Sequence, residues 1–189
     1  MEDLNRQRIL EVAHELFNIR GYKSVTISDI AEKLGMSKKT IYQYFSSKEE
    51  IASSVIEKVM SRIAEKFVLL EEGSDPISDI RSTFEQIKVE VSRVSPLFQE
   101  DIRKLLPQVH QKLREMRAEK FKMVEESIRK AQQLRQVKET VDAHLVTILF
   151  LGTLEGLSTS DLSRHGIPKL QAFDTLIDIF ISGILEHKL

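Results

Sequence analysis

The 189-residue sequence contains no cysteine and no tryptophan, and only seven glycines and four prolines. Without cysteine, the chain has no disulfide framework, no thiolate metal site and no cysteine nucleophile. Glycine and proline interrupt regular structure, so their scarcity, together with abundant Glu, Lys, Leu, Ile, Gln and Arg, predicts an all-α fold. Neither a glycine-rich phosphate loop nor an HExxH motif is present, which argues against the common phosphate-transfer and metallopeptidase chemistries.

The sequence also lacks the features of an exported or membrane protein. Its first ten residues, MEDLNRQRIL, are polar and have no apolar core of a signal peptide. The longest apolar run, residues 145–154, is far shorter than a membrane span. We therefore expect a cytoplasmic chain with no membrane partner. The formal net charge is −1, so any cationic surface for nucleic acid must be local.

Helical periodicity covers almost the whole chain, and its breaks fall at glycines and prolines. Gly21 is expected to take a left-handed conformation after the first helix. We predict about nine helices, at residues 4–20, 27–34, 38–45, 48–71, 76–94, 97–105, 108–135, 141–160 and 169–187.

The second and third predicted helices are joined by a tight turn, LGMS at residues 34–37. Thr26 is a good N-cap for the first of them, and Ser37 is a good N-cap for the next. Met36 and Ile41 flank the Ser37 cap at the positions of a hydrophobic staple. Two short helices with this connection predict a helix-turn-helix unit.

The third predicted helix has one apolar side and one polar side. At 100° per residue, Ile41 and Phe45 define the inward direction. The side chains that then point outward are Lys39, Thr40, Tyr42 and Gln43. No acidic residue occurs from Lys33 to Lys48, so the local potential is positive. An ordinary solvated lysine face is the alternative, but the preceding helix and turn favour a surface that reaches bases and phosphates in a major groove.

Residues 9–50 resemble the DNA-binding region of TetR-family transcriptional regulators. The motifs that carry the resemblance are Leu16-Phe17, Gly21-Tyr22, Thr26, Ile30-Ala31, Gly35-Met36-Ser37, Tyr42-Gln43-Tyr44-Phe45 and Lys48. Lys39 departs from the family pattern, in which many members carry a small residue, and it adds a charge to the DNA face. The resemblance implies a helix-turn-helix DNA-binding domain at residues 1–47 and a helical ligand-binding and dimerisation domain at residues 48–189.

The resemblance also implies which side chains contact double-stranded operator DNA. The expected base contacts are made by Lys39 and Gln43. The expected phosphate contacts are made by Thr26, Ser37, Lys38, Thr40, Tyr42, Tyr44 and Lys48. For Tyr44, packing against the core is an equal alternative, because the helical wheel places it nearer the core than Tyr42.

A single three-helix unit reads too few base pairs for useful specificity, so we expect a homodimer. The resemblance implies that the last two helices of each copy form a four-helix bundle. The expected interface residues are Gly152, Gly156, Phe173, Ile177, Phe180 and Ile184. Burial of these helices inside one chain is the alternative.

The central helices are expected to bind a small-molecule effector, as the resemblance implies. The candidate residues are Phe84, Phe98, His110, Arg117, Phe121, Val124 and His144. Arg117 lies on an otherwise apolar stripe, where it meets an acidic ligand or, alternatively, extends to solvent or pairs with an acid. Neither a cofactor nor a metal ion is expected.

The function predicted from these features is a repressor that an effector releases from its operator. A transcriptional activator of the same family and a helical interaction module that binds no DNA are the alternatives. An enzyme is disfavoured, since the only Glu-x-x-His pair of a di-iron bundle, Glu11 and His14, lies in the first helix.

Overall fold

The computed structural model describes residues 2–159 and 162–186. Over these residues the chain is helical, and its only β-pairing is an isolated bridge between Val137 and Leu185. The all-α prediction is confirmed. The helices are α1 (Glu2–Ser24), α2 (Ile27–Leu34), α3 (Lys38–Tyr44), α4 (Lys48–Lys66), α5 (Val68–Glu72), α6 (Pro76–Ser92), α7 (Pro96–Leu105), α8 (Pro107–Gln133), α9 (Ala143–Thr159), the 3₁₀ helix η1 (Leu162–His165) and α10 (Lys169–Ile184).

The described residues contain one α-helix more than the predicted nine, because the helix predicted at 48–71 divides at Phe67. The backbone N–H of Phe67 donates to the carbonyl of Ala64, three residues back, which tightens the last turn of α4. The Phe67 side chain is 2% exposed, so the break turns it into the core. The predicted helix ends at residues 160 and 187 lie outside the described residues.

Packing divides the chain into two compact units. The first, unit 1, comprises residues 1–62 and 93–114, and the second, unit 2, comprises residues 63–92 and 115–189. Unit 1 therefore contains α1, α2, α3, most of α4, α7 and the start of α8. This grouping by packing differs from the expected functional division after residue 47, which remains a prediction.

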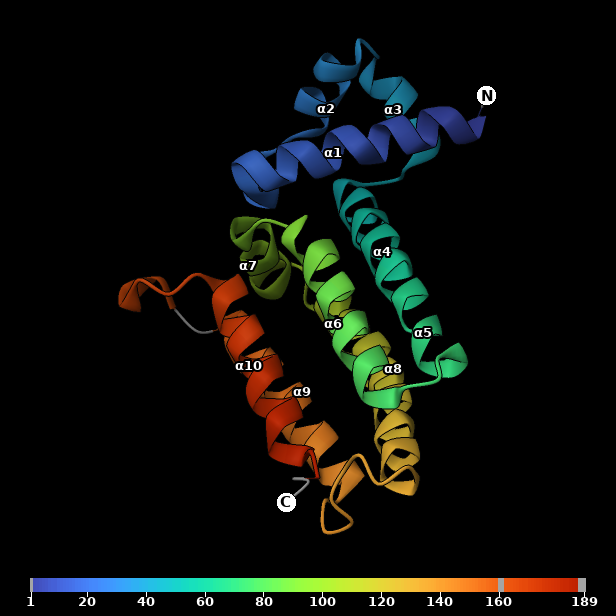
Figure 1. The fold of residues 1–189 in the computed structure, drawn as a ribbon. Helices are drawn as coiled ribbons and strands as arrows, with labels where there is room; N and C mark the ends of the chain where they lie inside the picture. The colour runs from blue at the N-terminus through green and yellow to red at the C-terminus, as the bar shows by residue number, and fades with distance from the viewer. Residues whose placement is uncertain (1, 160–161, 187–189) are drawn as a thin grey trace. The chain divides into compact units, whose positions relative to one another are not determined.

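Within unit 1, α2 and α3 pack beside α1 (Figure 1), and α7 packs on α1 as well. The ring centroids of Phe17 on α1 and Phe98 on α7 lie 5.0 Å apart. The Asn18 side chain makes two hydrogen bonds to the backbone of the turn before α7. Its Nδ2 donates to the carbonyl of Arg93 at 2.7 Å, and its Oδ1 accepts from the N–H of Ser95 at 2.8 Å. Apolar and polar contacts together fix α7 to α1.

The end of α1 bends at Gly21, whose backbone has φ 76° and ψ 156°. The predicted positive φ is confirmed, but the ψ value belongs to a region that only glycine enters readily, not to the left-handed helical region. Beyond the bend, the N–H of Lys23 donates to Oδ2 of Asp101 on α7 at 3.1 Å. A Cβ at position 21 would lie 2.7 Å from the same oxygen. Glycine therefore serves both the bend and the close approach of α7.

Unit 2 is built around aromatic side chains from four helices. Phe84 on α6, Phe121 on α8 and Phe150 on α9 are almost fully buried, with neighbouring ring centroids 4.9–6.0 Å apart. The ring centroid of Phe180 on α10 lies 4.3 Å from that of Phe150. Ion pairs join α6 to α10 at the surface: Arg81–Asp178 and Lys88–Asp174.

Gly21→Ala tests the bend. We expect it to lower the free energy of unfolding by about 3 kcal/mol, because alanine is strained at this φ and ψ and its Cβ would collide with Asp101. Gly35→Ala is the matched control: its φ is also positive, but nothing lies within 4 Å of the added Cβ, and a loss of only about 1 kcal/mol is expected. Equal losses in urea unfolding would show that α7 makes no close approach.

His14 of α1 is partly buried near Phe98 of α7, and the Nε2 atom of its ring is buried without a hydrogen-bond partner. Burial lowers the pKa of His14 below 6.5, and the nearby positive charge of Arg62 acts in the same direction. The folded chain therefore favours neutral His14 more than the unfolded chain does.

His14→Gln should accordingly flatten the pH dependence of stability. In the unsubstituted chain, the unfolded state binds more protons at this site, so stability falls as pH drops through 6.5 towards the lower folded pKa. Thermal unfolding between pH 5 and pH 8 measures this slope. His165→Gln, at an exposed histidine, is the matched control, and His14→Gln should flatten the curve more than it does.

Candidate nucleic-acid interface

The start of α2 is fixed by a capping box between Thr26 and Asp29. The Thr26 hydroxyl accepts from the N–H of Asp29 at 3.2 Å, and both the hydroxyl and the N–H of Thr26 bond the Asp29 carboxylate, at 2.6 and 2.7 Å. Hydrogen bonds from the Thr26 hydroxyl, from its backbone and from Arg20 lower the pKa of Asp29 to about 2. The Thr26 side chain is thus engaged within the cap, and its contact with phosphate remains a prediction.

The turn between α2 and α3 has the predicted form. Gly35 takes the left-handed helical conformation, φ 65° and ψ 30°, and the N–H of Met36 donates to the carbonyl of Ala31 at 2.9 Å. Ser37 caps α3 by accepting from the N–H of Thr40 at 3.0 Å. Its hydroxyl also bonds the Thr40 hydroxyl at 2.9 Å, so these two side chains hold each other.

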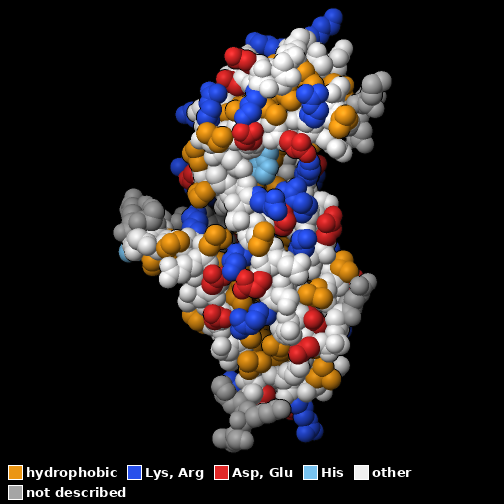
Figure 2. Space-filling model, turned by 45° about the horizontal axis from the view of Figure 1, so that its top comes forward, with side chains coloured by type: hydrophobic (Ala, Val, Ile, Leu, Met, Phe, Trp, Pro, Cys, Tyr) orange, Lys and Arg blue, Asp and Glu red, His pale blue; other side chains and the backbone are white. Residues whose placement is uncertain are grey.

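The inward side of α3 and the outward positions of Lys39, Tyr42 and Gln43 agree with the helical wheel, whereas Thr40 is only partly exposed. Ile41 is 0% exposed and Phe45 is 2% exposed, and together they hold the helix on its neighbours. The exposed side chains of α3 are those of Lys38, Lys39, Tyr42 and Gln43. Figure 2 shows cationic and acidic side chains interspersed over the face in view, in keeping with a net charge near zero. The cationic character of α3 is therefore a local property.

Tyr44 lies partly buried at the end of α3, where its hydroxyl oxygen accepts a hydrogen bond from Nδ2 of Asn5 at 3.1 Å. The partly buried ring and the bonded hydroxyl are compatible with both interpretations made from the sequence, packing against the core and contact with phosphate. Its contact with phosphate remains a prediction.

Lys48 is the first residue of α4, and its side chain points towards the end of α1 and the residue that follows it. Its ammonium donates to the carbonyls of Tyr22 and Val25, each at 2.8 Å, and lies 4.2 Å from the centroid of the Tyr22 ring. Burial lowers the pKa of Lys48. These contacts hold the segment that leads into α2, and a phosphate contact by Lys48 remains a prediction.

The two serines before α4, Ser46 and Ser47, have different roles at its start. The Ser47 hydroxyl accepts from the N–H of Glu50 at 3.0 Å, as an N-cap does. The Glu50 carboxylate accepts from both the N–H and the hydroxyl of Ser46 at 2.7 Å. The connection from α3 to α4 is thus fixed at both serines.

The predicted effector residues divide between the two units. Phe98 and His110 lie in unit 1, where Phe98 packs against Phe17 of α1. The candidates within unit 2 are Phe84, Arg117, Phe121, Val124 and His144. Of these, Phe84, Phe121 and Val124 are buried in the core, whereas His144 is exposed.

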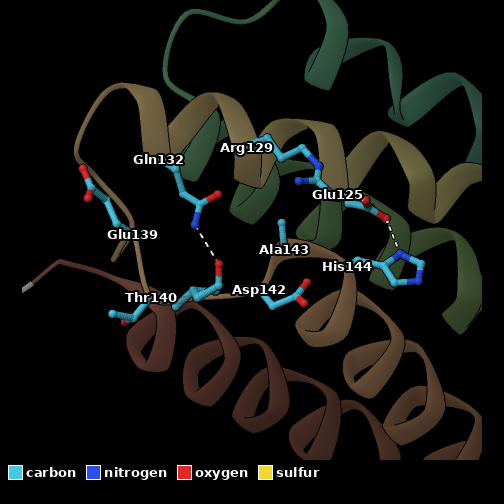
Figure 3. A pocket seen from close by; sticks show the side chains of 9 residues that line it. Glu125, Arg129, Gln132, Glu139, Thr140, Asp142, Ala143 and His144 are labelled. Atoms are coloured by element: carbon cyan, nitrogen blue, oxygen red, sulfur yellow. Dashed lines mark hydrogen bonds and ion pairs between the residues drawn. The ribbon is translucent and has the colours of Figure 1, made fainter.

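An open cavity of about 750 Å³ lies where α8 and the following loop meet the start of α9 (Figure 3). His144 is the only predicted effector residue in its lining, which is formed by Glu125, Arg129, Gln132, Glu139, Thr140, Val141, Asp142, Ala143 and His144. Glu125 accepts from Arg129 at 2.6 Å and pairs with Nδ1 of His144 at 2.8 Å. Hydrogen bonds from His144 and Arg129 lower the pKa of Glu125. Glu125, Arg129 and His144 of this cavity thus already interact with one another.

The predicted dimer residues fall into buried and exposed groups. Ile177 and Ile184 are buried within unit 2, and Phe173 and Phe180 are partly buried. Gly152 and Gly156 are exposed, with nothing within 4 Å of an added Cβ. The two glycines therefore lie on an open face of α9.

Some residues of this face were not predicted individually. Leu145, Ile148 and Leu149 of α9 are 51–59% exposed, and Ile179 of α10 is 65% exposed. The signal is in the sequence: positions 145, 148, 149, 152 and 156 follow helical spacing on one side of α9. The Asn5 contact with Tyr44 has no such local signal, because the two residues are 39 positions apart.

In the described part of the chain, no group of three or more His, Cys, Asp and Glu side chains is arranged to hold a metal ion. None of the helices described there is long and apolar enough to cross a membrane.

Residues 9–55, which include α2, α3 and the caps just described, match the family model of "Bacterial regulatory proteins, tetR family". The chain is 25% identical over 185 residues to YdgC, an uncharacterised HTH-type transcriptional regulator from Bacillus subtilis, and the match covers 96% of this chain and 93% of that protein. It is 32% identical over 85 residues to the HTH-type transcriptional regulator SAB2452 of Staphylococcus aureus. That match spans 45% of this chain and 43% of the staphylococcal relative.

Solved structures share the fold along nearly the whole chain. A transcriptional regulator from Saccharomonospora viridis in complex with choline has a TM-score of 0.79 at 24% identity, covering 98% of this chain and 100% of that one. A TetR-family regulator from Agrobacterium tumefaciens has a TM-score of 0.76 at 18% identity, covering 98% and 100%. Residues 9–55 therefore carry the DNA-binding region of the tetR family of bacterial regulatory proteins, and the whole chain has the fold of these solved regulators.

Proposed function

We propose that the chain is a homodimeric transcriptional repressor that binds operator DNA through α3 and leaves it when a small-molecule effector binds. Residues 1–47 would act as the reading head, and residues 48–189 would bind the effector and the second copy. The observation that carries the proposal is α3 itself, a short helix anchored by Ile41 and Phe45 that exposes two lysines, a tyrosine and a glutamine.

The chemistry of α3 suits the major groove of DNA. Gln43 can bond the N6 and N7 atoms of adenine, and Lys39 can donate to the acceptors of guanine. Lys38 and Tyr42, also exposed, have the donors that phosphate oxygens require. The relatives named above are described as HTH-type transcriptional regulators, which supports a DNA-binding function over a catalytic one.

The exposed stripe of α9 supports the dimer. Leu145, Ile148 and Leu149 leave a contiguous apolar surface in water, and Gly152 and Gly156 continue it with room for a close helix approach. A second copy that packs on this stripe and on Ile179 would bury it. Two reading heads could then contact half-sites about 34–36 Å apart.

Release by an effector would follow if the ligand favours a conformation in which the two reading heads no longer match their half-sites. The S. viridis structure holds choline, so a small ligand is compatible with this fold. In this chain, the aromatic cluster of Phe84, Phe121 and Phe150 would have to open to admit one, because these rings already fill the middle of unit 2. A reporter driven by a promoter that contains the selected site would distinguish repression from activation.

Gln43→Ala tests base reading. Duplexes selected from a random pool by the wild-type chain supply the operator, and fluorescence anisotropy measures affinity for it and for each single base-pair variant. The substitution should remove about 1–3 kcal/mol of discrimination at one base pair and leave the other positions unchanged. Unchanged preference at every position would exclude Gln43 from base reading.

Lys38→Ala should behave differently on the same duplexes. Loss of a phosphate contact should weaken binding to all sequences alike and reduce the slope of log affinity against log salt by about one. Lys130→Ala, at an exposed lysine near the end of α8, is the matched control and should change neither quantity. A sequence-dependent effect of Lys38→Ala would contradict its assignment to phosphate.

Leu149→Asp tests the dimer. A carboxylate in the middle of the exposed α9 stripe should give a monomeric mass in sedimentation at micromolar concentration and weaken operator binding by about tenfold or more, since each head would then bind alone. Leu134→Asp, at a residue 57% exposed beyond α8, should leave the dimer intact. A wild-type chain that sediments as a monomer would overturn this part of the proposal.

A further inference from the structure

Asn5 lies in the first turn of α1, and this end of α1 runs beside α3 (Figure 1). Its side-chain Nδ2 donates to the hydroxyl oxygen of Tyr44 at 3.1 Å. A tyrosine hydroxyl can donate one proton and accept at its oxygen. Since Asn5 supplies a donor to that oxygen, the proton of the Tyr44 hydroxyl is left for another acceptor.

The start of α1 is held firmly enough to make this contact specific. Arg6, the next residue, donates from Nη2 to the hydroxyl of Ser54 on α4 at 3.2 Å. Its guanidinium carbon also lies 4.7 Å from the centroid of the Phe45 ring, at the end of α3. One turn further along, Ile9 is fully buried. Contacts to α3 and α4 therefore fix the helix that carries Asn5.

We propose that Asn5 is a positioning residue for DNA binding: it holds the Tyr44 hydroxyl so that its proton is donated to a phosphate oxygen. The inference rests on the proposed function, because it assumes that α3 meets DNA. Phosphate oxygens only accept hydrogen bonds, so a hydroxyl that donated its proton into the protein could not bind one. An O–H···O⁻ bond to phosphate is charge-assisted, and the donor from Asn5 polarises the hydroxyl further.

The experiment is a double-mutant cycle on the duplex that the wild-type chain selects from a random-sequence pool. Tyr44→Phe removes the hydroxyl and should weaken binding about fivefold. Asn5→Ala should weaken it about threefold in the wild-type background and by less than about 1.5-fold in the Tyr44→Phe background, because Asn5 acts through the hydroxyl. Both effects should be the same on an unrelated duplex, since a phosphate contact carries no sequence information.

Asn5→Asp provides the second variant. Aspartate only accepts, so it takes the hydroxyl proton away from DNA, and binding should fall below that of Asn5→Ala. Gln7→Ala and Gln7→Asp, at an exposed amide two residues along α1, are the matched controls for truncation and for added charge. Asn5→Asp should lose clearly more affinity than Gln7→Asp, and thermal unfolding followed by circular dichroism should show all variants folded at the assay temperature.

Three results would overturn the role of Asn5 alone: no loss from Asn5→Ala, an equal loss in the presence and absence of the Tyr44 hydroxyl, or equal losses from Asn5→Asp and Gln7→Asp. A wild-type chain that selects no duplex would instead overturn the proposed DNA-binding function, and the role of Asn5 with it. The two failures are thus distinguished by the behaviour of the unsubstituted chain.

Discussion

The burial of Ile41 and Phe45 is the constraint on which the candidate interface depends. The helix they anchor, α3, has seven residues, and a helix of that length does not form in water on its own. Its outward side chains are polar and exposed, so they contribute little to holding it. The helix persists because two buried side chains, the Ser37 cap and the guanidinium over Phe45 fix its inner side and its ends. The side chains proposed to contact DNA and those that stabilise α3 therefore lie on opposite sides of the helix, so the outward residues can vary without loss of the fold.

Most helix boundaries could be predicted because their signals are local. The caps at Thr26 and Ser37 and the turn at Gly35 involve atoms no more than five residues apart, and the sequence contains all of them. The membership of α7 in unit 1 could not be predicted in this way. It depends on contacts such as those of Asn18 with Arg93 and of Asp101 with Lys23, which join positions 75 and 78 residues apart. Periodicity predicts that α7 is a helix with an apolar side, but not which other helix covers that side.

The same distinction explains the candidate site residues. The exposure of Lys39 and Gln43 follows from helical geometry once Ile41 and Phe45 are known to be buried. The positions of Thr26 and Lys48 do not, because a hydroxyl or an ammonium can donate to acceptors of its own unit as readily as to phosphate. Here the Thr26 hydroxyl donates to the Asp29 carboxylate, and the Lys48 ammonium donates to two backbone carbonyls. For the aromatic effector candidates, the prediction rested on apolar character within the helices where the resemblance implies a ligand site. It could not tell that Phe98 belongs to the core of unit 1 while Phe84 and Phe121 belong to that of unit 2.

In the proposed dimer, α9 would contribute both to the core of unit 2 and to the placement of the two DNA-binding heads. It is apolar on two sides, and a helix of this kind needs a partner on each. Phe150 and Ala143 on one side are buried within unit 2, while the stripe at residues 145, 148, 149, 152 and 156 meets water in the single chain. If a second copy covers this stripe, the same contact sets the separation of the two reading heads. Residues of α9, which touch no base, would then determine the spacing of half-sites that the dimer binds. Two heads held at a fixed separation can contact only half-sites that have the same separation along the duplex.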